Sequence, residues 1–396
     1  MTDWGIIMGQ LVRLGAEHFE AVYELYRYAF HKEPRGGKTA LAYFYKQTDS
    51  FGEFEGDHLT SQITQIPFQI NWIKQELPAN GIGNVGSYPE FRGNGAASRI
   101  MMETLQKGYD RGDVLSYLAP FSYGFYERFG YAHVFDHLQI SWLAQDFPQG
   151  RRAAGEMRRL DFETSQPLMA AVYDQAPEFQ IGSVVREKWW WQYYFAMKTP
   201  QTQYAVYLDE YGEPQGYVAY EFDNMIFKIR EWVTLTNNAL LMTTRFIGSH
   251  AGAFETFVYE SPISQVQAIP VLQLMTEPKY KAEIIPYMQA RIVNLAAFVA
   301  TLNLQQTEPV VFNVADESAP WNGGRFELQQ GRLQRIAQSQ APAISGNIQA
   351  FTQWLMGYRT LESLLITNDL QTDNPVVFQQ LAQYLPNQSP ILADYF

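Results

Sequence analysis

The stretch Phe91-Arg92-Gly93-Asn94-Gly95-Ala96-Ala97 decides the fold class of this chain of 396 residues. It follows an expected strand that ends near residue 87 and precedes an expected helix over residues 96–107. Glycine lets a backbone approach a ligand closely, and the free amides at a helix start attract anions. The helix dipole adds about half a positive charge to that of Arg92. The stretch therefore predicts a pyrophosphate-binding loop, although a glycine turn before an ordinary helix has the same short signature.

Composition narrows the class of protein. The length predicts two or three domains, and 46% hydrophobic residues are ample for their cores. The chain has no cysteine, which excludes disulfides and thiolate metal sites, and its six histidines show no metal-binding spacing. A net charge of −12 disfavours nucleic acid as a partner. Neither a signal peptide nor an apolar run of about eighteen residues is found, so we expect a cytoplasmic protein without a membrane partner or a metal.

The first segment alternates strands and helices, as in an α/β domain built on one sheet. The strands are expected at 10–14, 54–57, 62–72, 84–87, 114–118 and 137–142, and the helices at 16–31, 96–107 and 123–129.

The middle segment repeats this order after a break at residues 144–156. Its strands are expected at 157–160, 203–209, 215–222, 227–234 and 253–258, and its helices at 165–174, 185–197 and 238–247. The junction Leu235-Thr236-Asn237-Asn238 has no glycine, so this domain is predicted to be a copy without an anion site.

The last segment combines helices and strands and ends in an apolar tail. Helices are expected at 281–302, 347–357, 360–367 and 375–385, and strands at 310–315, 325–329 and 333–337. Most C-termini are polar and frayed, whereas residues 390–396 are mostly apolar and are expected to be buried. The predicted domains are residues 1–150, 151–280 and 281–396.

Three separate marks give the chain a family resemblance. The 92–97 loop, the segment Tyr126-Glu127-Arg128-Phe129-Gly130-Tyr131 and the aromatic terminus together resemble the Eis (enhanced intracellular survival) family of Gcn5-related N-acetyltransferases. The resemblance implies two tandem acetyltransferase-like α/β domains, the second degenerate, and a sterol-carrier-like α+β domain. It also implies that acetyl-CoA is the acetyl donor and that the acceptor is a primary amine of an aminoglycoside, a polyamine or a lysine-like compound. The assembly that it implies is a homohexamer.

The same resemblance assigns the donor site residue by residue. Val85, Gly86 and Ser87 would meet the pantetheine arm, where a splayed strand end offers free backbone groups. The pyrophosphate would lie on Arg92, Gly93, Asn94, Gly95, Ala96, Ala97 and Ser98, and the far side would be formed by Phe121 and Ser122. Two residues depart from the usual pattern: Ala97, where glycine is common, and Asn84, a polar residue before the splayed stretch.

Tyr126 matches the family's general acid. Departing coenzyme A is a thiolate whose conjugate acid has a pKa of about 8.5, so a tyrosine with a pKa of about 10 can protonate it if the hydroxyl reaches the sulfur. Tyr123 and Tyr131 are the nearby rivals, and a packed tyrosine without a catalytic role is the alternative interpretation.

The resemblance assigns the general base to the α-carboxylate of Phe396. An α-carboxylate with a pKa of about 3.5 is a weak base, so burial must raise its pKa or a water must relay the proton. The tail could instead only fill an apolar groove, or Asp394 could serve as the base. Tyr395 stands where the family often has an acid.

Two further expectations concern assembly and function. Trp189, Trp190 and Trp191 cannot all face one side of a helix, so at least one is expected at the surface or in a subunit contact. The chain is interpreted as an acetyl-CoA-dependent N-acetyltransferase, and a protein that binds acetyl-CoA or a lipid as a sensor, without turnover, is the alternative.

Overall fold

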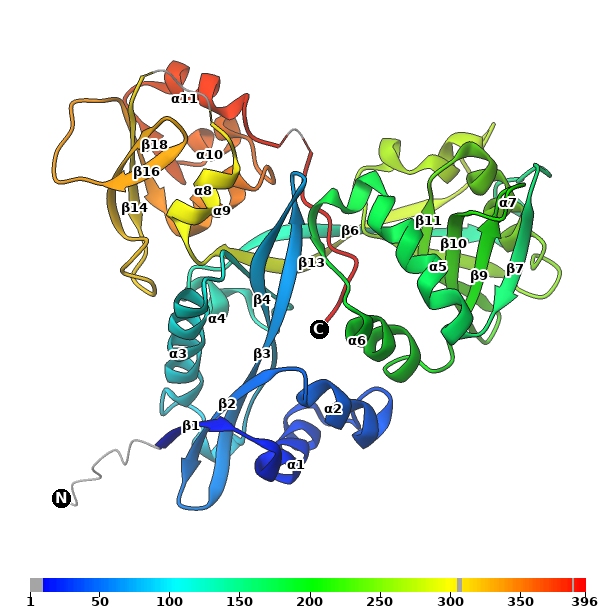
Figure 1. The fold of residues 1–396 in the computed structure, drawn as a ribbon, viewed down its shortest axis with the longest axis horizontal. Helices are drawn as coiled ribbons and strands as arrows, with labels where there is room; N and C mark the ends of the chain where they lie inside the picture. Colours follow the sequence, from blue (N-terminus) through cyan, green and yellow to red (C-terminus); the bar gives the residue numbers. More distant parts are fainter. Residues whose placement is uncertain (1–9, 305–307, 387) are drawn as a thin grey trace. The chain divides into compact units, whose positions relative to one another are not determined.

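The structure is a computed structural model that describes residues 10–304, 308–386 and 388–396 (Figure 1). The chain divides into two compact units. The first unit contains residues 1–135, 288–390 and 395–396, and the second contains residues 136–287 and 391–394. The tail is therefore shared: its last two residues belong to the first unit and the four residues before them belong to the second.

The N-terminal part of the first unit is a mixed sheet. Its strands lie in sequence order: β1 (Gln10–Leu14), β2 (Asp49–Glu55), β3 (His58–Trp72), β4 (Gln75–Ser87) and β5 (Leu115–Leu118). The first four pair antiparallel, and β4 pairs parallel with β5. A parallel pair needs a long crossover, which helix α3 (Ala96–Arg111) supplies between these two strands.

Helices cover both faces of this sheet (Figure 1). Helices α1 (Phe19–Phe30) and α2 (Gly37–Tyr45) close one apolar cluster, which contains Leu14, Val22, Leu25, Tyr45 and Leu59. Helix α3 closes the other with Ile100, Met101 and Leu105, which pack on Ile63, Ile82 and Leu118. The short helix α4 (Tyr123–Glu127) also contributes to the α3 cluster, through Tyr126.

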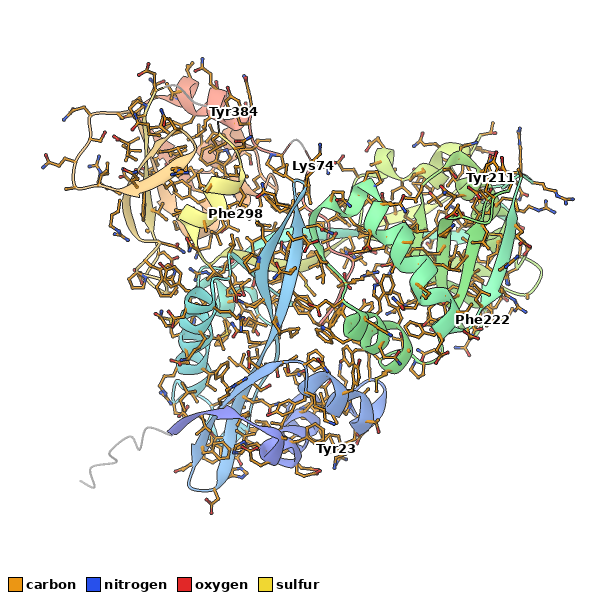
Figure 2. The ribbon with its side chains drawn as sticks, in the orientation of Figure 1. Tyr23, Lys74, Tyr211, Phe222, Phe298 and Tyr384 are labelled. Carbon is orange, nitrogen blue, oxygen red and sulfur yellow. The ribbon has the colours of Figure 1, made fainter. Side chains whose placement is uncertain are left out.

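The long β3–β4 hairpin was only partly predicted, because its turn has no sequence signal. Ile73 and Lys74 both adopt positive φ, 46° and 63°, a conformation that two-residue turns normally give to asparagine and glycine. Lys74 is at the tip of this hairpin (Figure 2). Helix α2 was not predicted at all.

The C-terminal part of the first unit is a second sheet with helices. Its strands lie in the order β16 (Arg332–Arg335), β15 (Gly324–Gln329), β14 (Val310–Ala315), β17 (Ala343–Asn347) and β18 (Leu370–Thr372). Its helices are α8 (Leu295–Thr301), α9 (Ile348–Leu355), α10 (Leu361–Ile366) and α11 (Pro375–Ala382). Phe298 of α8 (Figure 2) packs on Trp72 of β3, with ring centroids 4.9 Å apart.

The helix predicted over residues 281–302 is wrong. Strand β13 (Lys281–Ile292) occupies most of this range, and only α8 follows it. Residues 289–292 pair antiparallel with β5, and all four are buried. Only residues 288–292 of β13 are buried, and the apolar residues Ile284, Ile285, Met288 and Ile292 recur at spacings of one, three and four, which a helix would also give. Pro286 within the run was the sign against a helix.

The second unit repeats the order of the first. Its sheet has the order β6 (Ala132–Leu143), β12 (Thr256–Ser261), β11 (Ile226–Thr234), β10 (Pro214–Asp223), β9 (Gln203–Leu208) and β7 (Glu156–Leu160). Helix α5 (Phe162–Gln175) packs with one apolar cluster, and α7 (Asn237–Gly248) closes another through Ile247. The predicted α/β fold, with two tandem copies and a third α+β domain, is confirmed.

The tryptophan triplet is mostly core. Helix α6 (Lys188–Trp191) continues as a π-helical segment over residues 192–197. Trp190 and Trp191 are buried, whereas Trp189 is half-buried. Within the described residues, no helix is long and apolar enough to cross a membrane.

Candidate active site

In the sheet of the first unit, strand β4 extends beyond the end of its pairing with β5, and this gap in the pairing is called the opening of the sheet. Their parallel pairing ends at Ile82 and Leu118, but β4 continues to Ser87. Beyond Ile82 the β5 side of β4 is therefore not paired by β5. A ligand that carries amides can add to such an edge as an extra strand does.

A β-bulge lies in this free stretch of β4. Thr64 pairs with Gly83 and Gln62 pairs with Gly86, so Asn84 and Val85 together oppose one residue of β3. Asn84 has a φ of 50°, and its Nδ2 lies 3.4 Å from the Thr64 hydroxyl. Bulges turn the strand and redirect its backbone groups. The residues expected to meet pantetheine, Val85 to Ser87, begin inside this bulge.

The 92–97 loop has the geometry of an anion site. Gly93 and Gly95 have φ values of 84° and 83°, and Gly95 caps α3 without a side chain. Asn94 Oδ1 accepts a hydrogen bond from the Ala96 amide at 3.0 Å. The first turn of α3 carries no acidic residue, so its remaining amides present positive charge to an incoming anion.

An ion pair that sequence reasoning missed supports this loop. Arg99 Nη1 donates to the carbonyl of Asn94 at 2.8 Å, and its other guanidinium nitrogens bind both carboxylate oxygens of Glu53. Glu53 is buried, and the bidentate geometry fixes the arginine. Arg92 is exposed, with its Nε 3.3 Å from the Ser87 carbonyl. Arg92 thus remains accessible to an anion, while Arg99 positions the backbone.

The candidate acid lies on α4. Tyr126 is 2% exposed, and burial raises the pKa of its hydroxyl above the ordinary value, with smaller contributions from Tyr131 and Tyr395. Its rival Tyr131 is fully buried with its hydroxyl 2.6 Å from Ser116 Oγ, and burial raises the pKa of Tyr131 to about 12. Tyr131 therefore belongs to a structural network, and Tyr123 is exposed.

Phe121 and Ser122 begin the same helix. Ser122 is the N-cap residue of α4, and both residues are exposed. The Phe121 ring lies 5.3 Å from the Tyr126 ring. These residues are therefore adjacent to the candidate acid and open to a ligand.

The chain terminus lies on β4 next to the opening. The Phe396 ring packs 5.2 Å from the Phe68 ring. A Cβ added at Gly81 would lie 2.6 Å from this ring, and one added at Gly83 would lie 3.6 Å from the terminal carboxyl carbon. Gly81 therefore makes room for the ring, whereas a side chain at Gly83 would be in ordinary contact with the carboxyl group. The Gly81-Ile82-Gly83 pattern is visible in the sequence, but its role was not recognised.

Asp394 is not available as a base, which corrects that alternative. In the second unit its carboxylate accepts from Arg186 Nε at 2.9 Å and from Trp190 Nε1 at 2.7 Å. Arg186 also binds Glu231 at 2.8 and 2.6 Å, and both partners of Arg186 are buried. Burial raises the pKa of Asp394, and Arg186 opposes this shift. Asp394 is an anchor for the tail.

The second unit lacks the anion loop at the corresponding junction. Helix α7 is capped by Thr236, whose side chain accepts from the Ala239 amide at 3.2 Å. The Thr236 side chain thus binds an amide of the first turn of α7, whereas the N-cap residue of α3, Gly95, has no side chain. Among the residues that the structure describes, no cluster of three or more histidines or acids could hold a metal ion.

Family models match all three parts of the chain. Acetyltransferase (GNAT) domain models match residues 11–134 and 182–292, and a sterol carrier protein domain model matches residues 295–393. A solved structure from Enterococcus faecalis, described as a protein of unknown function and probable N-acyltransferase, is 33% identical over 98% of this chain and 99% of its own, with a TM-score of 0.91. The chain belongs to the Gcn5-related N-acetyltransferases.

Other relatives agree on the architecture. Eis1 from Mycobacterium abscessus superposes with a TM-score of 0.79 at 18% identity, over 98% of this chain and 100% of its own, which shows the three-domain Eis fold. An uncharacterized N-acetyltransferase from Streptomyces avermitilis is 26% identical over 190 residues, or 44% of this chain. That match spans 45% of the length of the curated relative. The predicted Eis-like architecture is confirmed.

Proposed function

We propose that this acetyltransferase transfers the acetyl group of acetyl-CoA to a primary amine of a small cationic acceptor, such as an aminoglycoside, a polyamine or a lysine-like compound. The donor would lie along Val85, Gly86 and Ser87, with its pyrophosphate on residues 92–98 and its far side against Phe121 and Ser122. Support comes from the bulged edge of β4 beyond its pairing with β5 and from the start of α3, whose N-cap residue Gly95 has no side chain.

The observation that carries the proposal is the position of the terminus. The carboxyl carbon of Phe396 lies beside Gly83, one residue past the last pair between β4 and β5. A base at the opening of a Gcn5-related fold is where an acceptor amine must lose a proton. A tail that only filled a groove would not need its carboxylate there.

Each group then has one role in the reaction. An amine of pKa about 10.4 is mostly protonated at neutral pH, so the Phe396 carboxylate first takes a proton from it, directly or through a water. The neutral nitrogen then attacks the thioester carbonyl carbon, a C–N bond forms and the C–S bond breaks. Tyr126 gives its proton to the departing thiolate, and its raised pKa keeps that proton available at neutral pH. The second proton, which the new amide nitrogen loses, restores the Tyr126 hydroxyl.

We also propose a homohexamer and domain limits at residues 1–150, 151–280 and 281–396. The half-buried Trp189 is compatible with a subunit contact. Light scattering tests the assembly, and a monomer of about 45 kDa (the chain mass is 45.5 kDa) would reject it.

The decisive experiment changes the terminus alone. Native protein, a variant without Phe396 and a C-terminally extended variant are compared for thiol release from acetyl-CoA with a panel of amines, and acetyl-CoA affinity is measured for each. Deletion moves the carboxylate by up to about 3.5 Å, and extension turns it into an amide. We expect turnover to fall about 100- to 10,000-fold with affinity retained. Full turnover of the extended variant would refute the base, and binding without turnover in native protein would favour a sensor.

A further inference from the structure

Three consecutive carbonyls directly after Tyr126 accept side-chain hydrogen bonds, two from the third domain and one from strand β13, which precedes it. All of these contacts lie within the first unit. The Glu127 carbonyl accepts from Gln349 Nε2 at 2.7 Å, and the Arg128 carbonyl accepts from Ser318 Oγ at 2.8 Å. The Phe129 carbonyl accepts from Arg291 Nη1.

These carbonyls lie at and just after the C-terminal end of α4, the helix that carries the candidate acid. Helix α4 has only five residues, so it has few hydrogen bonds of its own to fix its position. The last carbonyls of a helix have no partner within the helix and need one from elsewhere. The Tyr126 carbonyl is satisfied locally, by the amides of Phe129 and Tyr131 at 2.9 and 3.3 Å. The Glu127 carbonyl accepts from the Gly130 amide at 2.9 Å in addition to Gln349. The carbonyls of Arg128 and Phe129 take side-chain donors from Ser318 of the third domain and Arg291 of β13.

Arg291 is itself fixed by the third domain. Its side chain is fully buried and binds Asp316, which follows β14. Asp316 in turn accepts from the Ala319 amide at 3.1 Å and from Asn322 Nδ2 at 3.2 Å. A cation at a helix C-terminus is also favoured by the helix dipole. The position of Arg291, and with it the end of α4, is therefore set by the loop after β14.

Gly130 allows this close approach. Its φ is 79°, and an added Cβ would lie 2.7 Å from Arg291 Nη1 and 2.8 Å from Ile348 Cγ2 of α9. A side chain here would be strained and would push both groups away. The glycine in the Tyr126–Tyr131 segment is thus explained by a contact with the third domain and by its backbone conformation.

We propose that the sterol-carrier-like domain positions the general acid. Its Gln349 and Ser318, together with Arg291 of β13, which Asp316 of that domain binds, are positioning residues that hold α4 and so direct the Tyr126 hydroxyl. This role rests on the proposed function of Tyr126. It gives the third domain a part in acetyl transfer that requires no lipid ligand.

The test uses full-length variants and a matched control on one helix. Gln349 and Gln353 both lie on α9, and both donate to carbonyls of the first domain: Gln349 to Glu127 of α4, and Gln353 to His133 of β6 at 3.0 Å. Gln349→Ala and Ser318→Ala are compared with Gln353→Ala. Each is also made in a Tyr126→Phe background, and kcat and the KM for acetyl-CoA are measured together with thermal stability.

We expect Gln349→Ala and Ser318→Ala to lower kcat about 10- to 100-fold with little change in KM, because a small displacement of an acid costs rate rather than affinity. In the Tyr126→Phe background the same changes should cause no further loss, since the group that they position is gone. Gln353→Ala should keep native kcat.

Other outcomes overturn the proposal. Native kcat in both Gln349→Ala and Ser318→Ala would show that α4 needs no support from the third domain. Equal losses in the native and Tyr126→Phe backgrounds would show that the contacts act elsewhere in the fold. Full activity of the single variant Tyr126→Phe would show that Tyr126 is not the general acid. That result would refute the proposed function, and it is measured separately from the variants of Gln349 and Ser318.

Discussion

Substituting Gly81 tests directly whether the rate of acetyl transfer depends on the position of Phe396 beside β4. An alanine Cβ at this position would lie 2.6, 2.8 and 3.0 Å from three carbons of the Phe396 ring. Carbon atoms in contact prefer separations of about 3.5–4.0 Å, so the ring must move by about 1 Å. Gly81 is not among the glycines with positive φ, so alanine adds no backbone strain of that kind.

A shift of the ring displaces the carboxylate attached to the same residue. A displacement of about 1 Å costs on the order of 100-fold in rate when a catalytic group must be aligned. Forcing the ring to stay would instead cost about 1–3 kcal/mol of stability, as overpacking usually does. We therefore expect Gly81→Ala to reduce kcat about 100-fold with unchanged affinity for acetyl-CoA.

Gly83 provides the matched control on the same strand. A Cβ there would lie 3.6 Å from the Phe396 carboxyl carbon and 3.7 Å from Ile66, both ordinary contacts. Gly83→Ala should therefore retain much more activity than Gly81→Ala. The double variant Gly81→Ala with Phe396→Leu should recover part of the loss, because leucine lacks Cε2 and Cζ, two of the three ring atoms that clash. Steady-state kinetics and calorimetry decide the outcome, and native kcat in a folded Gly81→Ala protein would refute the assigned position of the terminus.

Three other predictions concern the acid, the tail anchor and the anion loop. Tyr126→Phe should lower kcat about 100- to 10,000-fold. Because burial raises the pKa of Tyr126, the pH–rate profile of the native enzyme should show no alkaline decline from this group below about pH 10. Asp394→Asn leaves Arg186 with one carboxylate and should lower the free energy of unfolding by about 3–5 kcal/mol in chemical denaturation. The control Tyr217→Phe removes one hydrogen bond to Glu231 and should lower it by about 1 kcal/mol. Equal losses in the two variants would contradict the role of Asp394 as an anchor of the tail. Gly95→Val should abolish acetyl-CoA binding in calorimetry, whereas Gly112→Val, which strains a φ of 93° at the other end of α3, should preserve it.

Local sequence was enough for the order of most elements and for the candidate anion loop. Helix and strand periodicities reflect neighbouring residues, and a glycine loop before a helix is a contiguous signal. Resemblance to a family extended this to Tyr126 and Phe396. Local signals failed at residues 281–292, where apolar residues of a strand happen to recur at spacings that are typical of a helix. They also failed at Ile73 and Lys74, which form a two-residue turn with positive φ that these residue types do not favour.

Only the tertiary structure decided which charged groups could take part in chemistry. Asp394 and the terminal carboxylate are two residues apart, and only the family resemblance favoured the second as a base. In the fold their surroundings differ: Arg186, 208 residues earlier in the chain, binds Asp394, whereas the carboxyl carbon of Phe396 lies near Gly83. Arg291, Ser318 and Gln349 donate to carbonyls near the end of α4 that lie 162, 190 and 222 positions away from them in the sequence. Such partners are set by long-range packing, which one sequence without an alignment does not encode in any local pattern.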